Sequence, residues 1–333
     1  MNKFSFTNQK ILVTGAAGFI GFFLSKRLLE EGANVYGVDN LNDYYDVALK
    51  QSRLSILKNY PHFTFLKIDI SNKDALSETF ASFRPDYVVN LAAQAGVRYS
   101  IDHPDVYIQS NLIGFFNILE LCRKFQPKHL IFASSSSVYG ANTKVPFSTD
   151  DKTDRPVSLY AATKKSDELL AYAYSSLYAI PSTGLRFFTV YGPYGRPDMA
   201  YFKFADRIMR NEKIQVYNHG DMLRDFTYID DIIEGIIRVI PILPKQETGE
   251  KALFKVYNIG GGQPEKLMTM IDVLQKVLHK KANIEFLDMQ PGDVYETFAD
   301  SKEFEQVFGF TPEINMERGL ALFGKWYLKD RIS

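Results

Sequence analysis

Residues 11–21 read ILVTGAAGFIG, and this stretch decides the fold. Its first four residues form an apolar, β-branched run that is typical of a buried strand, and a helical pattern extends from Phe19 to Glu31. Gly15, Gly18 and Gly21 have a G-x-x-G-x-x-G spacing and join the two elements. Such a turn lets the backbone approach a pyrophosphate, whose charge the helix N-terminus stabilises. The stretch therefore predicts a dinucleotide-binding turn.

The same alternation continues through the first half of the chain. Helical patterns separate four further apolar runs, which we predict to be strands: Val35–Asp39, Phe63–Ile68, Tyr87–Asn90 and Leu130–Ala133. Alternating strands and helices imply a parallel sheet covered on both faces, so the predicted class is α/β, a doubly wound (Rossmann) fold. The alternation of strands and helices becomes less regular after about residue 190. Beyond that point, helices are expected at 229–240 and 266–278. We expect a dinucleotide-binding domain over 1–185 and a smaller α/β substrate-binding portion over 186–333, interleaved with the first.

Composition excludes several classes of protein. The 39 basic and 39 acidic side chains cancel, so nothing in the overall charge favours nucleic acid or an anionic membrane as a partner. No apolar run has the length of a membrane span, and no secretory signal is recognisable. Cys122 is the only cysteine, which excludes an internal disulfide, and its apolar neighbours predict a buried thiol. The five histidines are scattered, so we expect no metal site. Since neither a signal nor a span is recognisable, we expect a cytoplasmic protein.

Polar residues that follow the predicted strands extend the nucleotide site. Asp39 ends the second strand, where a carboxylate accepts hydrogen bonds from the adenosine ribose and repels a 2′-phosphate; this favours NAD over NADP. Asp69 and Ile70 follow the third strand and are candidates for adenine contacts, although Asp69 or Ser71 is equally suited to capping a helix. Small residues follow Asn90, as expected for a segment close to a cofactor.

A tyrosine and a lysine four residues apart are the candidate catalytic pair. Tyr160 and Lys164 lie near the start of a predicted helix over 159–177, and their spacing places them on one face. A neighbouring ammonium favours the phenolate, which can take a proton from a sugar hydroxyl. Ser135 stands in the serine-rich stretch 133–140 at the end of the fifth strand, where ligands of parallel sheets bind.

These motifs together resemble the extended short-chain dehydrogenase/reductase family, and in particular its nucleotide-sugar 4-epimerases. The resemblance covers nearly the whole length and includes the glycine turn, the segment 90–93, the serine stretch, the Tyr160/Lys164 pair and RDFTYIDD at 224–231. Within the family the chain looks most like UDP-glucuronate 4-epimerases. The segments that carry this finer resemblance are 96–100, 191–200 and 290–294.

The resemblance implies a mechanism and a set of contacts. Tyr160 would take the C4 hydroxyl proton of a UDP-sugar while hydride passes to NAD, Ser135 would assist, Lys164 would orient the ribose, and the 4-keto sugar would turn over before hydride returns. The implied cofactor contacts are Gly15, Gly18, Phe19, Ile20, Gly21, Asp39, Asn40, Asp69, Ile70, Leu91, Ala92, Ala93, Tyr160 and Lys164. The implied substrate contacts are Arg98, Ser136, Ser137, Thr189, Arg196, Arg224 and Asp293, with Arg224 at the diphosphate and Asp293 near the uridine ribose.

Arg196 bears on which sugar is bound. A glucuronate oxidised at C4 is a β-keto acid that loses carbon dioxide readily, so an epimerase must hold its carboxylate. Arg196, or the hydroxyls of Ser136 and Ser137, are candidates for that role, and a structural arginine in a Pro-Gly loop is the alternative.

Other functions remain open at this point. Dehydratases of the family carry an acid pair, and decarboxylases a Glu, where this chain has Ser136 and Ser137, so elimination and decarboxylation are disfavoured. A 4-epimerase of UDP-N-acetylglucosamine, UDP-N-acetylglucosaminuronate or UDP-glucose is the nearest rival, and a non-catalytic NAD-sensing protein a further one. The predicted helices over 105–124 and 159–177 would pair in a homodimeric four-helix bundle, as in family members.

Overall fold

The computed structural model describes residues 5–289 and 295–331 and shows two compact units. Unit 1 comprises residues up to 142, 149–187 and 233–258. Unit 2 comprises 143–148, 188–232 and the residues from 259 onward. The chain therefore leaves unit 1 briefly at 143–148 and again after its sixth strand, and it enters unit 2 for the last time at residue 259.

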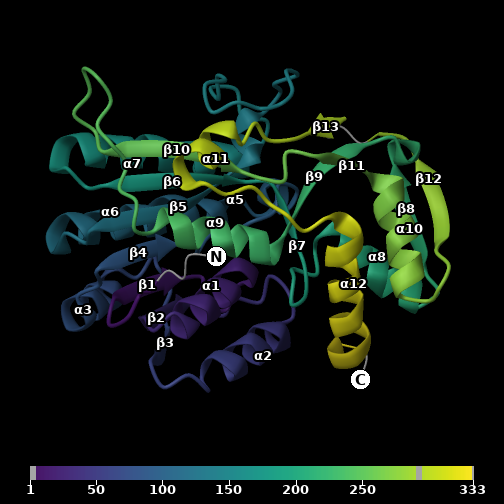
Figure 1. Ribbon diagram of the computed structural model, residues 1–333, viewed down its shortest axis with the longest axis horizontal. Coiled ribbons are helices and arrows are strands. Elements are labelled where there is room, and N and C mark those ends of the chain that lie inside the picture. Colours follow the sequence, from purple (N-terminus) through teal and green to yellow (C-terminus); the bar gives the residue numbers. More distant parts are fainter. Residues whose placement is uncertain (1–4, 290–294, 332–333) are drawn as a thin grey trace. The chain divides into compact units, whose positions relative to one another are not determined.

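A seven-stranded sheet forms the centre of unit 1, in the order β10-β6-β5-β4-β1-β2-β3 (Figure 1). The pairings that join β1 to β6 are all parallel, which confirms the predicted doubly wound α/β class. The strands are β1 (Lys10–Thr14), β2 (Asn34–Asp39), β3 (Phe63–Lys67), β4 (Tyr87–Asn90), β5 (His129–Ser135), β6 (Ser182–Phe187) and β10 (Phe254–Ile259). The helical segments are α1 (Phe19–Glu30), α2 (Val47–Leu57), α3 (Lys73–Phe83), α4 (Tyr99–Asp102), α5 (Pro104–Tyr107), η1 (Ile108–Ile113), α6 (Gly114–Phe125), η2 (Ser136–Tyr139) and α7 (Leu159–Tyr178).

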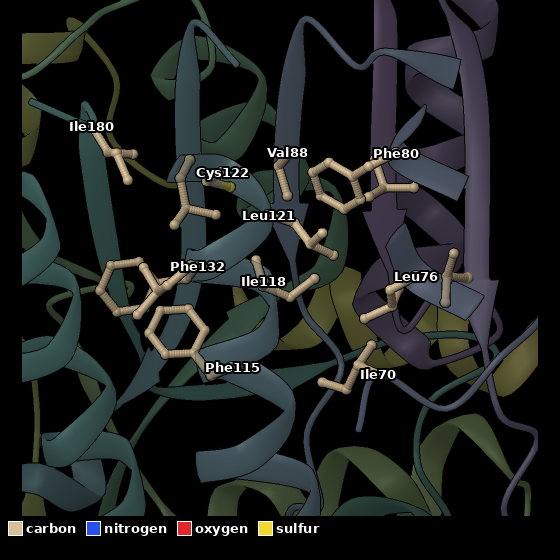
Figure 2. Close-up of a cluster of buried hydrophobic side chains, with 14 of the residues drawn as sticks. Ile70, Leu76, Phe80, Val88, Phe115, Ile118, Leu121, Cys122, Phe132 and Ile180 are labelled. Atoms are coloured by element: carbon tan, nitrogen blue, oxygen red, sulfur yellow. The ribbon is translucent and has the colours of Figure 1, made fainter. Parts of the chain in front are cut away.

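The core of unit 1 explains why these segments fold together. Buried side chains of α3 and α6 pack on the apolar sheet residues Leu12, Val88 and Phe132 in one continuous cluster (Figure 2). Cys122 belongs to this cluster and is fully buried, as predicted, and burial raises the pKa of its thiol. Because right-handed crossovers place α1 on the opposite face, both faces of the sheet are covered.

The predicted helix over 105–124 differs in one respect from the structure. Three consecutive segments replace it, and the middle one, η1, is a π-helix. A π turn holds more residues than an α turn and often lies at a functional site. Here it carries Asn111, whose side chain is buried and reaches the start of α7.

Unit 2 has less regular β structure and an aromatic core. Strand β9 pairs with β7, β11 and β13, while β8 pairs with β12. The buried rings of Tyr201, Phe202 and Phe323 contact one another at centroid distances of 5.0–6.2 Å. The elements are β7 (Thr189–Tyr191), α8 (Ala200–Met209), β8 (Lys213–Tyr217), η3 (Asn218–Gly220), β9 (Leu223–Tyr228), β11 (Pro264–Lys266), α10 (Leu267–Val277), β12 (Asn283–Leu287), β13 (Glu296–Thr297), α11 (Lys302–Phe308), α12 (Met316–Trp326) and η4 (Tyr327–Arg331). Helix α9 (Ile229–Val239) begins in unit 2 and continues into unit 1.

Within the ranges that the structure describes, no helix combines the length and apolarity that crossing a membrane requires.

Candidate active site

The glycine turn lies between β1 and α1, as predicted. Gly15 has φ +70°, and a Cβ there would stand 2.9 Å from the backbone nitrogen of Ala92. A Cβ on Gly21 would stand 2.1 Å from the carbonyl oxygen of Gly15. Gly18 is the N-cap of α1 and offers no side chain to its first N–H groups. The turn therefore closes only with glycine, and it leaves the positive end of a 12-residue helix without a side-chain cap.

The segment after β4 packs against this turn. Thr14 donates to the side-chain oxygen of Asn90 at 2.7 Å and accepts from the backbone N–H of Ala92 at 3.1 Å. Thr14 and Asn90 are also direct partners in the sheet, so their strands end level with each other. The predicted contacts at Leu91, Ala92 and Ala93 thus lie beside the glycine turn, where a bound dinucleotide would pass.

Asp39 ends β2 and is buried against the turn. One carboxylate oxygen accepts from the N–H of Ala17 at 3.2 Å and the other from that of Leu41 at 2.8 Å. The ammonium of Lys50 lies 3.6 Å from the carboxylate, a neighbour that the sequence did not indicate because α2 brings it from 11 positions away. Burial lowers the pKa of Lys50, and Asp39 partly opposes this shift. A cation and an anion thus stand together where the ribose was predicted to bind.

Asp69 does not cap a helix, and neither does Ser71. The N-cap of α3 is Asn72, whose side chain accepts from the N–H of Ala75, so the capping alternative was wrong. Asp69 instead accepts from Asn40 at 2.7 Å and from the Ser71 hydroxyl at 2.7 Å. Burial raises its pKa, but these hydrogen bonds outweigh burial and leave the pKa below the ordinary value. Asn40 and Asp69, both predicted cofactor contacts, therefore form one polar pair, and Ile70 next to them is buried in the core.

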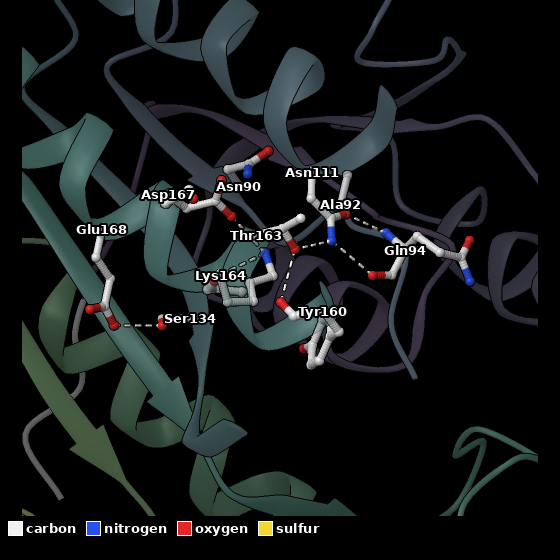
Figure 3. Close-up of polar contacts among 12 residues, drawn as sticks. Asn90, Ala92, Gln94, Asn111, Ser134, Tyr160, Thr163, Lys164, Asp167 and Glu168 are labelled. Atoms are coloured by element: carbon white, nitrogen blue, oxygen red, sulfur yellow. Dashed lines mark hydrogen bonds and ion pairs between the residues drawn. The ribbon is translucent and has the colours of Figure 1, made fainter. Parts of the chain in front are cut away.

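Helix α7 presents the predicted catalytic pair (Figure 3). Ser158 caps the helix by accepting from the N–H of Ala161, which places Tyr160 in the first turn. One turn later Lys164 is buried, and its ammonium donates to the carbonyl oxygen of Ala133 on β5 at 3.0 Å. Asp167, which we did not predict, accepts from the same ammonium at 3.0 Å. The sequence did hold a signal for it, since Asp167 is three residues from Lys164 on the same helical face.

Ser135 is the last residue of β5, two residues beyond the carbonyl that Lys164 contacts. Its hydroxyl oxygen caps the short helix η2 by accepting from the N–H of Ser137 at 3.2 Å. It also donates to the Ser137 hydroxyl at 3.1 Å. Ser136 and Ser137 lie in η2 rather than on the strand, and both are half-buried. The end of β5 and the start of α7 thus supply a hydroxyl, a phenol and an ammonium from neighbouring elements.

Asn111 supports the first turn of α7 and was also not predicted. Its amide nitrogen donates to the Thr163 hydroxyl at 3.0 Å, and Thr163 donates to the carbonyl oxygen of Tyr160 at 2.9 Å. Its amide oxygen accepts from the N–H of Gln94 at 2.8 Å (Figure 3). The π segment η1 therefore joins the segment that follows β4 to the helix that carries Tyr160.

The remaining predicted substrate contacts are spread over the two units. In unit 1, Arg98 is exposed at the start of α4. In unit 2, Thr189 begins β7, and Nη1 of Arg224 donates to the carbonyl oxygens of Leu223 and Tyr295. Arg196 forms a two-point ion pair with Asp198, so part of its guanidinium fork is already used. Asp293 lies outside the described residues.

Comparison with known proteins places the chain in a family. Residues 11–260 match the NAD dependent epimerase/dehydratase family. This chain belongs to that family. Its cofactor is accordingly NAD, and its predicted membership of the extended short-chain dehydrogenase/reductase family is confirmed.

Individual relatives are similar over almost their full lengths. Protein CapI of Staphylococcus aureus is 52% identical, with 96% of this chain and 99% of the relative covered. A probable UDP-glucuronate 4-epimerase of Rhizobium meliloti is 47% identical, with 96% and 97% covered. The crystal structure of UDP-glucuronic acid 4-epimerase from Bacillus cereus, in complex with UDP-glucuronic acid and NAD, has a TM-score of 0.87 at 33% identity, with 96% and 99% covered.

The donor set of unit 1 fits NAD. The tight turn at Gly15 and Gly21, the uncapped N-terminus of α1 and the Asp39 carboxylate suit a pyrophosphate and an adenosine ribose. Among the described residues, no group of three or more His, Cys, Asp or Glu side chains is placed to hold a metal ion.

Proposed function

We propose that the chain interconverts UDP-glucuronate and UDP-galacturonate by inverting the configuration at C4 of the sugar. The coarser assignment follows from its relatives: the chain is an NAD-dependent 4-epimerase of UDP-sugars and hence an isomerase. The finer assignment to UDP-glucuronate is supported by a relative and a structural neighbour that are named as UDP-glucuronate 4-epimerases. The observation that carries the chemistry is the pairing of Tyr160 and Lys164 with the serine end of β5.

The residues of unit 1 define what each group would do. When bound at the glycine turn, Asp39 and Lys164, NAD would supply the acceptor for the C4 hydride and the donor for its return. Tyr160, as phenolate, takes the proton of the C4 hydroxyl, which leaves a 4-keto sugar, and gives the proton back when hydride returns to the opposite face. Ser135 hydrogen-bonds the reacting oxygen. Lys164 holds its charge beside Tyr160 and binds the nicotinamide ribose.

We assign NAD to unit 1 and the nucleotide part of the substrate to unit 2. Arg224 of unit 2 is the proposed ligand of the diphosphate, because a guanidinium binds phosphate oxygens in a planar, two-point geometry. Thr189, Asp293 and, from unit 1, Arg98 are further proposed substrate contacts.

Arg196 is the proposed determinant of the C6 carboxylate, with Ser136 and Ser137 as the other donors. Asp198 accepts from Nε and Nη2 of Arg196, and this ion pair orients the guanidinium within the loop. The test compares Arg196→Ala on UDP-glucuronate and on UDP-glucose. A loss confined to UDP-glucuronate supports the role, and equal losses on both substrates contradict it.

The decisive experiment identifies products. Purified protein is incubated separately with UDP-glucuronate, UDP-glucose and UDP-N-acetylglucosamine, and NMR follows inversion at C4, with Tyr160→Phe as the matched inactive control. We expect UDP-galacturonate as the main product. Faster inversion of a neutral or N-acetylated sugar would reassign the substrate, and retention of NAD without any turnover would favour an NAD-sensing protein.

We further propose a homodimer in which η1–α6 and α7 of two copies form a four-helix bundle. Ile113 and Phe116 on the first element and Leu169 and Leu177 on the second are 39–70% exposed, an apolar surface that a second copy would bury. Light scattering should show a dimer that Leu169→Glu disrupts. Leu243→Glu, at a side chain 46% exposed outside these helices, is the control. A monomeric parent protein would contradict the proposal.

We keep a cytoplasmic location as a proposal. The single, buried cysteine requires no oxidising compartment. Fractionation of producing cells would test it, and recovery in another compartment would contradict it.

A further inference from the structure

Asp167 is a buried carboxylate in direct contact with the lysine of the candidate active site. Its side chain is 1% exposed and that of Lys164 is 2% exposed. One carboxylate oxygen accepts from the ammonium at 3.0 Å. The other, Oδ1, is buried and has no hydrogen-bond partner among the residues that the structure describes. Ionising a carboxylate in such a buried position costs free energy. We therefore ask what Asp167 does for Lys164.

The surroundings of Asp167 define its charge. Burial raises its pKa to about 6, Lys164 acts in the opposite direction, and Glu168 on the same helix adds to the rise. From β6, the guanidinium of Arg186 is bound to Glu168 rather than to Asp167, and from β5 the Ser134 hydroxyl also donates to Glu168. Asp167 is therefore ionised at neutral pH and takes up a proton under mildly acidic conditions.

The contact fixes the direction of the catalytic ammonium. Tyr160, Lys164 and Asp167 are spaced at i, i+4 and i+7 and share one helical face (Figure 3). Lys164 has three N–H donors, of which one binds the Ala133 carbonyl and one binds Asp167. These two bonds, from different elements, determine where the third N–H points. A flexible four-carbon side chain would otherwise have several rotamers.

We propose that Asp167 is a positioning residue, whose ionised carboxylate holds the Lys164 ammonium against the end of β5 in the geometry that turnover needs. This inference rests on the proposed function, in which Lys164 acts beside Tyr160. Protonation of Asp167 removes the charge-assisted bond, so the rate should fall as Asp167 takes up a proton in acid.

The test compares the wild-type protein with Asp167→Asn, because protonated Asp and Asn present equally neutral groups of nearly the same shape. The ratio of the two kcat values at each pH removes the effects of pH that both proteins share. We expect a ratio of about ten at pH 8, given the strength of charge-assisted hydrogen bonds. The ratio should fall towards one as the pH falls through about 6. Asp167→Glu, which restores a carboxylate, should recover part of the rate.

A ratio that stays constant across this pH range would overturn the proposal, since a structural role of Asp167 does not depend on its charge. So would a ratio of one at every pH. KM should change little, because the predicted substrate contacts lie outside α7.

A measurement without substrate separates this inference from the proposed function. In wild-type protein labelled with ¹⁵N-lysine, the Nζ resonance of Lys164, assigned by Lys164→Arg, should shift as the pH falls through about 6 and Asp167 takes up a proton. A Nζ resonance that does not shift in this range would overturn the role of Asp167 whatever the enzyme's substrate. Absence of turnover with every UDP-sugar would count against the proposed function alone.

Discussion

Arg186 and Glu168 are joined by two nearly equal hydrogen bonds in the interior of unit 1. Nε donates to Oε1 at 2.8 Å and Nη2 donates to Oε2 at 2.9 Å, and both side chains are at most 4% exposed. Ser134, next to Ser135, donates to the same carboxylate at 2.7 Å. The pair therefore ties β6, the end of β5 and α7 together behind the candidate active site.

Breaking this pair should destabilise the protein strongly. Glu168→Ala leaves a buried guanidinium without its counter-charge, for which we expect a loss of about 3–5 kcal/mol in the free energy of unfolding. Arg123→Ala, which breaks an ion pair on α6 with a side chain 46% exposed, should cost less than about 1 kcal/mol. Urea unfolding measures both values, and similar losses for the two variants would contradict the expectation.

Removing the phenol of Tyr160 should abolish turnover while leaving the nucleotide site intact. Tyr160→Phe should lower kcat by about 10²–10⁴, the usual contribution of a positioned acid–base group. KM and bound NAD should be nearly unchanged, because the glycine turn and Asp39 are untouched. Tyr178→Phe, at an exposed position of the same helix, is the control. Steady-state kinetics on the preferred UDP-sugar would decide the matter, and a fully active Tyr160→Phe would exclude Tyr160 as the base.

A methyl group at Gly15 should displace the segment after β4 and weaken NAD binding. Its Cβ would stand 2.9 Å from a backbone atom, which cannot move aside as a side-chain end does, and its φ of +70° adds backbone strain. Gly249→Ala shares the strain at φ +85° but meets nothing within 4 Å. We expect Gly15→Ala to purify without NAD and Gly249→Ala to retain it, as ultraviolet absorbance would show. Equal NAD content in the two variants would contradict the role of the turn.

His129 should make unit 1 sensitive to acid. Its ring contacts the carbonyl oxygen of Ile240 and the hydroxyl of Thr183, and burial lowers the pKa to about 4. The unfolded chain has the ordinary value of about 6.5, so the stabilisation is fully present above that pH and is lost as the pH falls towards 4. This window corresponds to roughly 3 kcal/mol.

The matched variant for this expectation is His129→Asn. Its free energy of unfolding, measured by urea titration at several pH values, should decline less steeply between about pH 6.5 and 4 than that of the parent protein. Parallel declines would show that His129 is not the group responsible.

The strands of unit 1 and helix α7 were predictable because apolar runs and their periodicity determine them locally. The π turn at η1 was not, since its extra residue is held by bonds from Asn111 to Gln94 and Thr163, which are 17 and 52 positions away. The contact of Lys50 with Asp39 was not predictable for the same reason, because only the folded α2 brings the Lys50 ammonium to Asp39. Capping of α3 was not predictable for a different reason. Asp69, Ser71 and Asn72 all carry side-chain oxygen acceptors within four positions, and the sequence does not show which of them caps the helix.

The residues of the candidate site also differ in how far the sequence predicted them. Tyr160, Lys164 and Ser135 carry patterns that can be read along the chain. The partners that hold them are contributed by other strands and helices, and only the fold reveals them.

Cys122 gives the protein a practical property. Its thiol is the only one in the chain, is fully buried, and is kept protonated by burial. Alkylating reagents react with thiolates, so they should reach Cys122 only when the core of unit 1 opens. The rate at which Cys122 is labelled should therefore report how often the core of unit 1 opens. A second cysteine placed on the surface could carry a dye or spin label without first removing Cys122.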